Sequence, residues 1–164
     1  MRLLTVGTLF FAAVVAVSSG QTPTYGARAT VAKGVDAAKF KTYSWTKGGP
    51  SANKAVDGQI VAAVDRELKA VGLTKATSGK GDVLVTYYSL RRTDVDLKAE
   101  PDASGARPQY AVGSLLVALV DPVTLKRVVE LRTDKPVDLD PAKSEAVVNS
   151  AVTELFAKYP TRQK

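Results

Sequence analysis

The side chains that could do chemistry in this chain are carboxylates, hydroxyls and basic groups, because its 164 residues include no cysteine and no histidine. This excludes thiolate nucleophiles, disulfides, zinc fingers, iron-sulfur clusters and serine-histidine relays. Paired carboxylates are the remaining acid–base route, as in sugar hydrolysis, where two carboxyl groups lie about 5 to 9.5 Å apart. Asp65 with Glu67 and Asp94 with Asp96 are candidate pairs, and they are equally well explained as solvated surface charges.

Three other segments resemble ligand-binding or catalytic motifs, and each lacks an essential part. Ser51 and Lys54 have the spacing of penicillin-recognising enzymes, but the companion Ser-Asp-Asn and Lys-Thr-Gly elements are absent. A calcium loop counted from Asp94 has Ala99 where glycine is required. The Gly-Lys-Gly at 79–81 lacks the earlier glycine and the following Ser or Thr of a phosphate loop. We therefore expect no metal and no cofactor.

Aromatic residues are the first candidates for ligand binding. Tyr43 and Trp45 lie two apart in a strand-like segment, so they point to the same side and could form a platform for a sugar ring or a peptide side chain. Burial in the core is the competing interpretation, because aromatic side chains usually contribute about 150 to 250 Å² of core area each. Tyr87 and Tyr88 are adjacent and must point to opposite faces, so at most one of them can join such a platform.

Basic residues are the second candidates, because 23 Lys and Arg outnumber 16 Asp and Glu, giving a net charge of +7. The longest basic clusters are the pairs Arg91–Arg92 and Lys126–Arg127, and no longer run of positive charge exists. This pattern does not favour nucleic acid as a partner. It favours weak attraction to anionic lipid headgroups or to a polyanionic envelope polymer, and we include Arg91 and Arg92 among the candidate binding residues.

The first 20 residues have the pattern of a secretory signal peptide. Arg2 precedes an almost wholly apolar stretch from Leu3 to Val17, and the small residues at 18–20 suit cleavage after Gly20. We expect export to the periplasm or beyond, a flexible segment at 21–28, one domain at 29–160 and a short tail at 161–164. A bacterial lipid anchor would need a cysteine just after the cleavage point, so we expect none.

The rest of the chain predicts an α+β domain. Strands are expected at 29–35 and 40–46, pairing as a hairpin, and at 82–90, 115–120 and 125–132. Helical periodicity indicates a helix from about 56 to 72, capped by Ser51 or Asn53, and a second one that begins after the cap Asp140 and ends before Pro160. Each helix has one apolar stripe, so we expect two helices on one face of a mostly antiparallel sheet of about five strands. The polar stretch 91–109 is either a long loop or a hidden strand.

Several of these segments, taken in order, resemble the bacterial family known as domain of unknown function 4136. The resemblance rests on the segment Phe-Lys-Thr-Tyr-Ser-Trp at 40–45, the helix at 60–72, Asp-Val-Leu-Val at 82–85 with Tyr87, the Asp-Pro-x-Thr turn after 113–120, and the last helix with Phe156, Tyr159 and Pro160. It covers nearly the whole expected domain. It implies an envelope location and a mixed fold, and it supplies no catalytic residues.

These observations favour an exported, non-catalytic envelope module that binds a protein, a peptide or an anionic envelope polymer. The candidate binding residues are Tyr43, Trp45, Tyr87, Arg91 and Arg92. A small carboxylate-dependent hydrolase acting on an envelope glycan is the alternative, and a purely structural surface protein is a third. The sequence does not indicate an oligomeric state.

Overall fold

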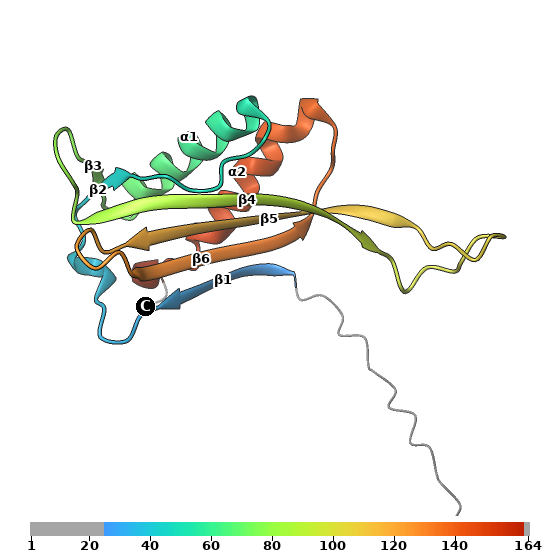
Figure 1. Ribbon diagram of the computed structural model, residues 1–164, viewed down its shortest axis with the longest axis horizontal. Helices are drawn as coiled ribbons and strands as arrows, with labels where there is room; N and C mark the ends of the chain where they lie inside the picture. The colour runs from blue at the N-terminus through green and yellow to red at the C-terminus, as the bar shows by residue number, and fades with distance from the viewer. Residues whose placement is uncertain (1–24, 163–164) are drawn as a thin grey trace, which may run out of the picture.

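The computed structural model describes residues 25–162, so the expected signal peptide at 1–20 lies outside the described residues. Six strands form one sheet in the order β1-β6-β5-β4-β2-β3, and two helices lie along it (Figure 1). The expected α+β class with two helices is confirmed; the sheet has six strands and is mixed. The strands are β1 (Gly26–Val31), β2 (Thr42–Trp45), β3 (Thr74–Lys75), β4 (Val83–Val95), β5 (Gln109–Val120) and β6 (Arg127–Pro136).

Both helices begin close to the expected residues. Helix α1 (Lys54–Ala70) is capped by Asn53, whose side chain accepts hydrogen bonds from the amides of Ala55 and Val56. Asp140 caps a short 3-10 turn, Pro141–Lys143, which leads directly into α2 (Ser144–Phe156). The chain leaves α1 through Gly72, whose φ of 93° is the left-handed conformation that glycine adopts without a steric penalty.

The core lies between the two helices and one face of the sheet. Alternate residues of β4, β5 and β6 point to this face, as the pleat of a strand requires, and they meet Val64 and Leu68 of α1 and Phe156 of α2. The contributing strand residues are Val83, Val85, Tyr87, Leu115, Val117, Leu119, Val129 and Leu131. In the part of the chain that the structure describes, the opposite face of the sheet carries no helix (Figure 1). Within the described range, neither helix is long and apolar enough to cross a bilayer.

The expected hairpin between the first two strands is wrong. β1 pairs antiparallel with β6 at one edge of the sheet, whereas β2 pairs in parallel with β4 near the other edge. A short 3-10 turn at Ala37–Lys39 lies between them. Helix α1 then provides the crossover between β2 and β3, because neighbouring parallel strands cannot be joined by a tight turn. β1 also begins at Gly26, inside the segment expected to be flexible.

The polar stretch 91–109 contains both strand and loop. β4 continues to Val95 and β5 begins at Gln109, so the two strands project past the body of the sheet as a ribbon (Figure 1). The intervening loop is internally bonded: the Arg107 guanidinium donates to the carbonyl oxygens of Leu97 and Ala99 at 2.8 and 2.6 Å. Both faces of this ribbon meet solvent, so polar residues can continue the pairing of β4 with β5 there.

Candidate functional site

Asp65 of α1 joins the two aromatic residues that the sequence singled out. Its Oδ1 accepts hydrogen bonds from the Tyr43 hydroxyl at 2.6 Å and from the Trp45 indole nitrogen at 2.8 Å. The Lys75 ammonium lies 3.3 Å from the other carboxylate oxygen. The Asp65 carboxylate therefore links α1 to β2, because it accepts hydrogen bonds from both the Tyr43 hydroxyl and the Trp45 indole nitrogen.

Tyr43 belongs to the core, so the platform of two exposed rings is not formed. The residue is 3% exposed, and burial, followed by the hydrogen bond and negative charge of Asp65, raises the pKa of its phenol. Trp45 is only partly buried and packs against the edge of the core cluster. The strand periodicity correctly placed both rings on one side, but that side is the one covered by the helices.

A cavity of about 430 Å³ lies beside Trp45. Trp45 and Tyr87 meet edge to face, with ring centroids 6.2 Å apart, and form one part of its wall. The Tyr87 hydroxyl donates a hydrogen bond to Asp57 of α1. The lining residues are Trp45, Thr46, Lys47, Gly48, Pro50, Val61 and Tyr87. The cavity is thus mostly apolar and aromatic, with one lysine in its wall.

Gly48 lets the loop after β2 pass close to β4 and form one wall of this cavity. A Cβ atom on Gly48 would lie 2.2 Å from the Tyr87 carbonyl oxygen and 2.4 Å from the Thr86 hydroxyl, so no larger residue fits without moving backbone. The loop is fixed by hydrogen bonds from the Gly49 amide to the Tyr87 carbonyl and from the Thr86 hydroxyl to the Lys47 carbonyl, both 2.9 Å. The wall formed by residues 46–50 is therefore built into the sheet edge.

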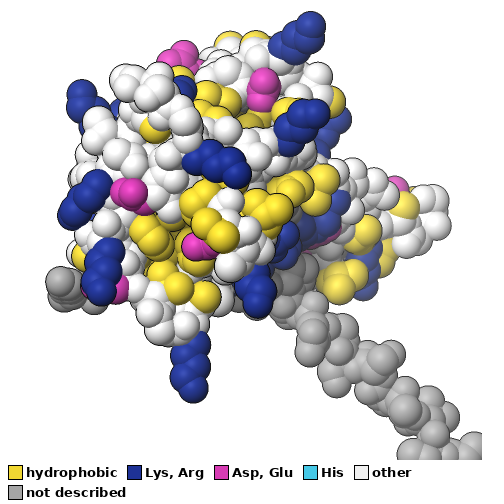
Figure 2. Space-filling model, turned by 60° about the vertical axis from the view of Figure 1, so that its left-hand side comes forward, with side chains coloured by type: hydrophobic (Ala, Val, Ile, Leu, Met, Phe, Trp, Pro, Cys, Tyr) yellow, Lys and Arg dark blue, Asp and Glu magenta, His cyan; other side chains and the backbone are white. Residues whose placement is uncertain are grey.

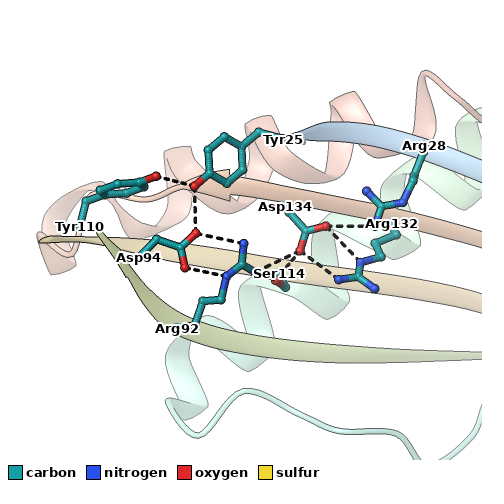
Figure 3. Close-up of polar contacts among 8 residues, drawn as sticks. All are labelled: Tyr25, Arg28, Arg92, Asp94, Tyr110, Ser114, Arg132 and Asp134. Atoms are coloured by element: carbon teal, nitrogen blue, oxygen red, sulfur yellow. Dashed lines mark hydrogen bonds and ion pairs between the residues drawn. The ribbon is translucent and has the colours of Figure 1, made fainter. Parts of the chain in front are cut away.

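A second polar cluster lies on the face of the sheet that the helices leave uncovered (Figure 3). Asp134 of β6, 4% exposed, accepts from the Ser114 hydroxyl at 2.5 Å and from Arg132 at 3.1 and 3.3 Å. Arg28 and Arg92 reach the same carboxylate at 3.3 and 3.5 Å. Burial opposes ionisation, but the hydrogen bonds from Arg132 and Ser114 and the nearby guanidinium charges outweigh it and hold the pKa of Asp134 at about 2.

The same cluster continues to the base of the projecting ribbon. Arg92 also pairs with Asp94 at 2.9 Å, and the Tyr25 hydroxyl lies 2.9 Å from Asp94 and 2.6 Å from the Tyr110 hydroxyl (Figure 3). The Arg92 hydrogen bond holds the pKa of Asp94 below its usual range, although partial burial opposes this. Tyr25 thus links the chain just before β1 to β4 and β5, across the open face.

The structure separates the five residues singled out from the sequence into four places. Trp45 and Tyr87 line the cavity, and Tyr43 lies beneath it in the core. Arg92 belongs to the cluster on the open face, whereas Arg91, its neighbour in the strand, points to the other side and is exposed.

Sequence reasoning named Asp65 only as a possible acid–base partner of Glu67, and it missed the contacts that α1 makes with the aromatic rings. Asp57, Val61 and Asp65 recur at a spacing of four, so they share one stripe of α1, and all three face the cavity or the rings around it. The available signal was a pair of acids placed one helical turn on either side of Val61. Pairing them with Tyr87, Tyr43 and Trp45 required the strand order, which the sequence did not supply.

Among the described carboxyl groups whose pKa is shifted, none shows the rise that a general acid would need. A general acid needs a raised pKa, so that it is still protonated near neutral pH. Wherever the pKa of a described carboxyl group is shifted, hydrogen bonds and charges lower it; the groups are Asp82, Asp94, Asp102, Asp121, Asp134, Asp138 and Glu154. Asp57 and Asp65 are both engaged by ring substituents, and they lie eight residues apart on α1, which is roughly 12 Å along a helix axis.

The sequence profile of a domain of unknown function, DUF4136, matches residues 28–161. The chain belongs to this family. No curated protein sequence matches the chain. Membership in DUF4136 agrees with the resemblance noted from the sequence and assigns no activity.

Solved structures show how widely the fold of this DUF4136 chain recurs. A PDZ domain protein from Parabacteroides distasonis superposes with a TM-score of 0.59 at 16% identity, over 83% of this chain and 35% of that one. This chain therefore spans about a third of the length of that protein. A PelC dodecamer from Paraburkholderia phytofirmans gives a TM-score of 0.54 at 11% identity, over 82% of this chain and 97% of that one. At these identities the likeness concerns the fold alone.

Proposed function

We propose that this protein is an exported, non-catalytic binding module of the cell envelope, whose aromatic cavity holds an apolar side chain of a peptide or protein segment. The observation that carries the proposal is the cavity of about 430 Å³ beside the partly exposed ring of Trp45. Ligand sites are commonly concave, largely apolar and about 300 to 1,000 Å³ in volume.

The chemistry of the lining favours a peptide side chain over a sugar. Trp45, Val61, Pro50 and the ring of Tyr87 offer apolar contact, whereas a sugar would need several hydrogen-bonding groups for its hydroxyls. The Tyr87 hydroxyl already donates to Asp57. Lys47 adds one positive charge to the wall, which favours a carboxylate near the inserted side chain.

Export rests on the sequence of the first 20 residues and on the envelope location that the family resemblance implies. Its test is the mass of the protein isolated from cells. We expect a mature N terminus at Gln21 in the periplasmic or extracellular fraction. An intact Met1 in the cytoplasmic fraction would contradict export and would leave the cavity proposal standing.

Binding can be followed directly because Trp45 is the only tryptophan in the chain. Its fluorescence should change saturably when a tripeptide with a central phenylalanine and a free carboxyl terminus is added. Val61→Phe places a larger side chain from α1 in the cavity and should abolish the fluorescence change. The free energy of unfolding of this variant, measured separately, shows whether it is folded. A trisaccharide of N-acetylglucosamine is the matched sugar probe. An equal response to the sugar, or a response that Val61→Phe leaves intact, would contradict the proposal.

A further inference from the structure

The turn between β5 and β6 exposes two large apolar side chains. Val123 is 87% exposed and Leu125 is 67% exposed. Only one residue separates them in the chain, so the two exposed side chains belong to the same turn. Leu125 also has a φ of 55°, and among the described residues it is the one non-glycine residue with positive φ. Turns usually place glycine or asparagine at such a position, because a leucine there is strained. The exposure of Val123 and Leu125 and the strained backbone of Leu125 do not stabilise the fold.

The turn presents these side chains rigidly. Asp121 accepts hydrogen bonds from the amides of Val123 and Thr124 at 3.0 and 2.6 Å and from the Thr124 hydroxyl at 2.9 Å. The Leu125 amide donates to the Asp121 carbonyl, and the Asp121 amide donates to the Lys126 carbonyl. The outward direction of Val123 and Leu125 is therefore built in.

Two lysines flank this apolar tip, and the one carboxylate within the turn, Asp121, is engaged by the turn's own amides and the Thr124 hydroxyl. The Lys80 ammonium lies 3.4 Å from the Pro122 carbonyl oxygen, and Lys126 follows Leu125 directly. Within the described residues neither lysine makes an ion pair, whereas Arg127 is paired with Glu130 at 2.7 Å. Figure 2 shows the end of the molecule that carries this turn: apolar side chains gather there among Lys and Arg side chains, with fewer acidic ones.

We propose that this tip, residues 122–126 with Lys80, docks on the surface of an anionic lipid bilayer. Val123 and Leu125 enter the headgroup region, and Lys80 and Lys126 meet the lipid phosphates. Protruding apolar residues flanked by lysines match such a surface in both polarity and charge, since each basic group near anionic lipid adds attraction that salt weakens. The tip shares no residue with the lining of the Trp45 cavity, so the proposal does not depend on the ligand of that cavity.

The test is co-sedimentation of the purified protein with vesicles of phosphatidylglycerol and phosphatidylethanolamine, compared with phosphatidylcholine vesicles. Leu125→Asn is the decisive variant, because asparagine tolerates positive φ. We expect it to raise the free energy of unfolding, while partitioning onto anionic vesicles falls about tenfold. Lys126→Gln should lower partitioning about fivefold at low salt. Leu139→Asn is the matched control, since Leu139 is 57% exposed elsewhere, and it should partition like the wild type.

Three results would overturn the proposal. They are wild-type protein that does not sediment with anionic vesicles, equal binding to phosphatidylcholine, and Leu125→Asn that partitions like the wild type. All variants share one N terminus, so any contribution from that end cancels in the comparison.

Discussion

Replacing Asp65 by alanine should destabilise the protein through the two ring substituents that it holds. The Tyr43 hydroxyl and the Trp45 indole nitrogen lose a charged acceptor at 2.6 and 2.8 Å. Hydrogen bonds to charged groups contribute about 1.5 to 3 kcal/mol each, and the buried hydroxyl of Tyr43 is left without a partner. Trp45 is partly exposed and can reach water, so its loss is at the lower end. We expect a loss of about 3 kcal/mol in the free energy of unfolding.

Urea unfolding measures this loss. Circular dichroism is the probe in place of tryptophan fluorescence, because the substitution itself alters the surroundings of Trp45. Lys75→Gln is the control: it removes only the exposed ion pair with Asp65 and should change stability by less than about 1 kcal/mol. A double-mutant cycle with Tyr43→Phe should give a coupling free energy above about 1 kcal/mol. If Asp65→Ala costs no more than Lys75→Gln, the assignment of Asp65 as the tie between β2 and α1 is refuted.

Four further substitutions test the rest of the fold. The pKa of Asp134 is about 2 in the folded chain, below its unfolded value, so Asp134 contributes roughly 2 kcal/mol above pH 4 that disappears as pH falls from about 4 to 2; Asp134→Asn should lack this component in urea titrations across that range. Gly81→Ala brings a Cβ within 2.5 Å of the Tyr43 backbone and should cost at least about 2 kcal/mol, whereas Gly58→Ala, with open space around it, should stabilise α1 by about 1 kcal/mol. The Tyr159 hydroxyl is buried without a partner in the described part of the chain, and burial raises its pKa to about 12, so Tyr159→Phe should leave the melting temperature unchanged or higher.

The sequence predicted the elements whose signal is local. Asn53 and Asp140 were recognisable as caps because a side-chain oxygen before a periodic apolar stretch satisfies free amides in any context. The opposite faces of Tyr87 and Tyr88 followed from the pleat, and the structure confirms them: Tyr87 is in the core and Tyr88 is exposed.

Strand order and the assembly of the cavity were beyond local signals. Two strands separated by a short turn usually pair, but here the parallel pairing of β2 with β4 depends on α1 as a crossover. The cluster around Asp134 draws on β1, β4, β5 and β6, so its residues are far apart in sequence. The length of β4 was underestimated because its outer half, Arg91 to Val95, is polar on both faces and resembles a loop.

The central claim, that the cavity beside Trp45 is the binding site, is tested most directly by the indole N–H signal of Trp45 in a ¹⁵N-labelled sample. The chain has one tryptophan, so this resonance is unambiguous. We predict a saturable shift as the phenylalanine tripeptide is added, and no shift in folded Val61→Phe. A Trp45 signal that stays fixed while backbone signals elsewhere respond to the peptide would contradict the claim.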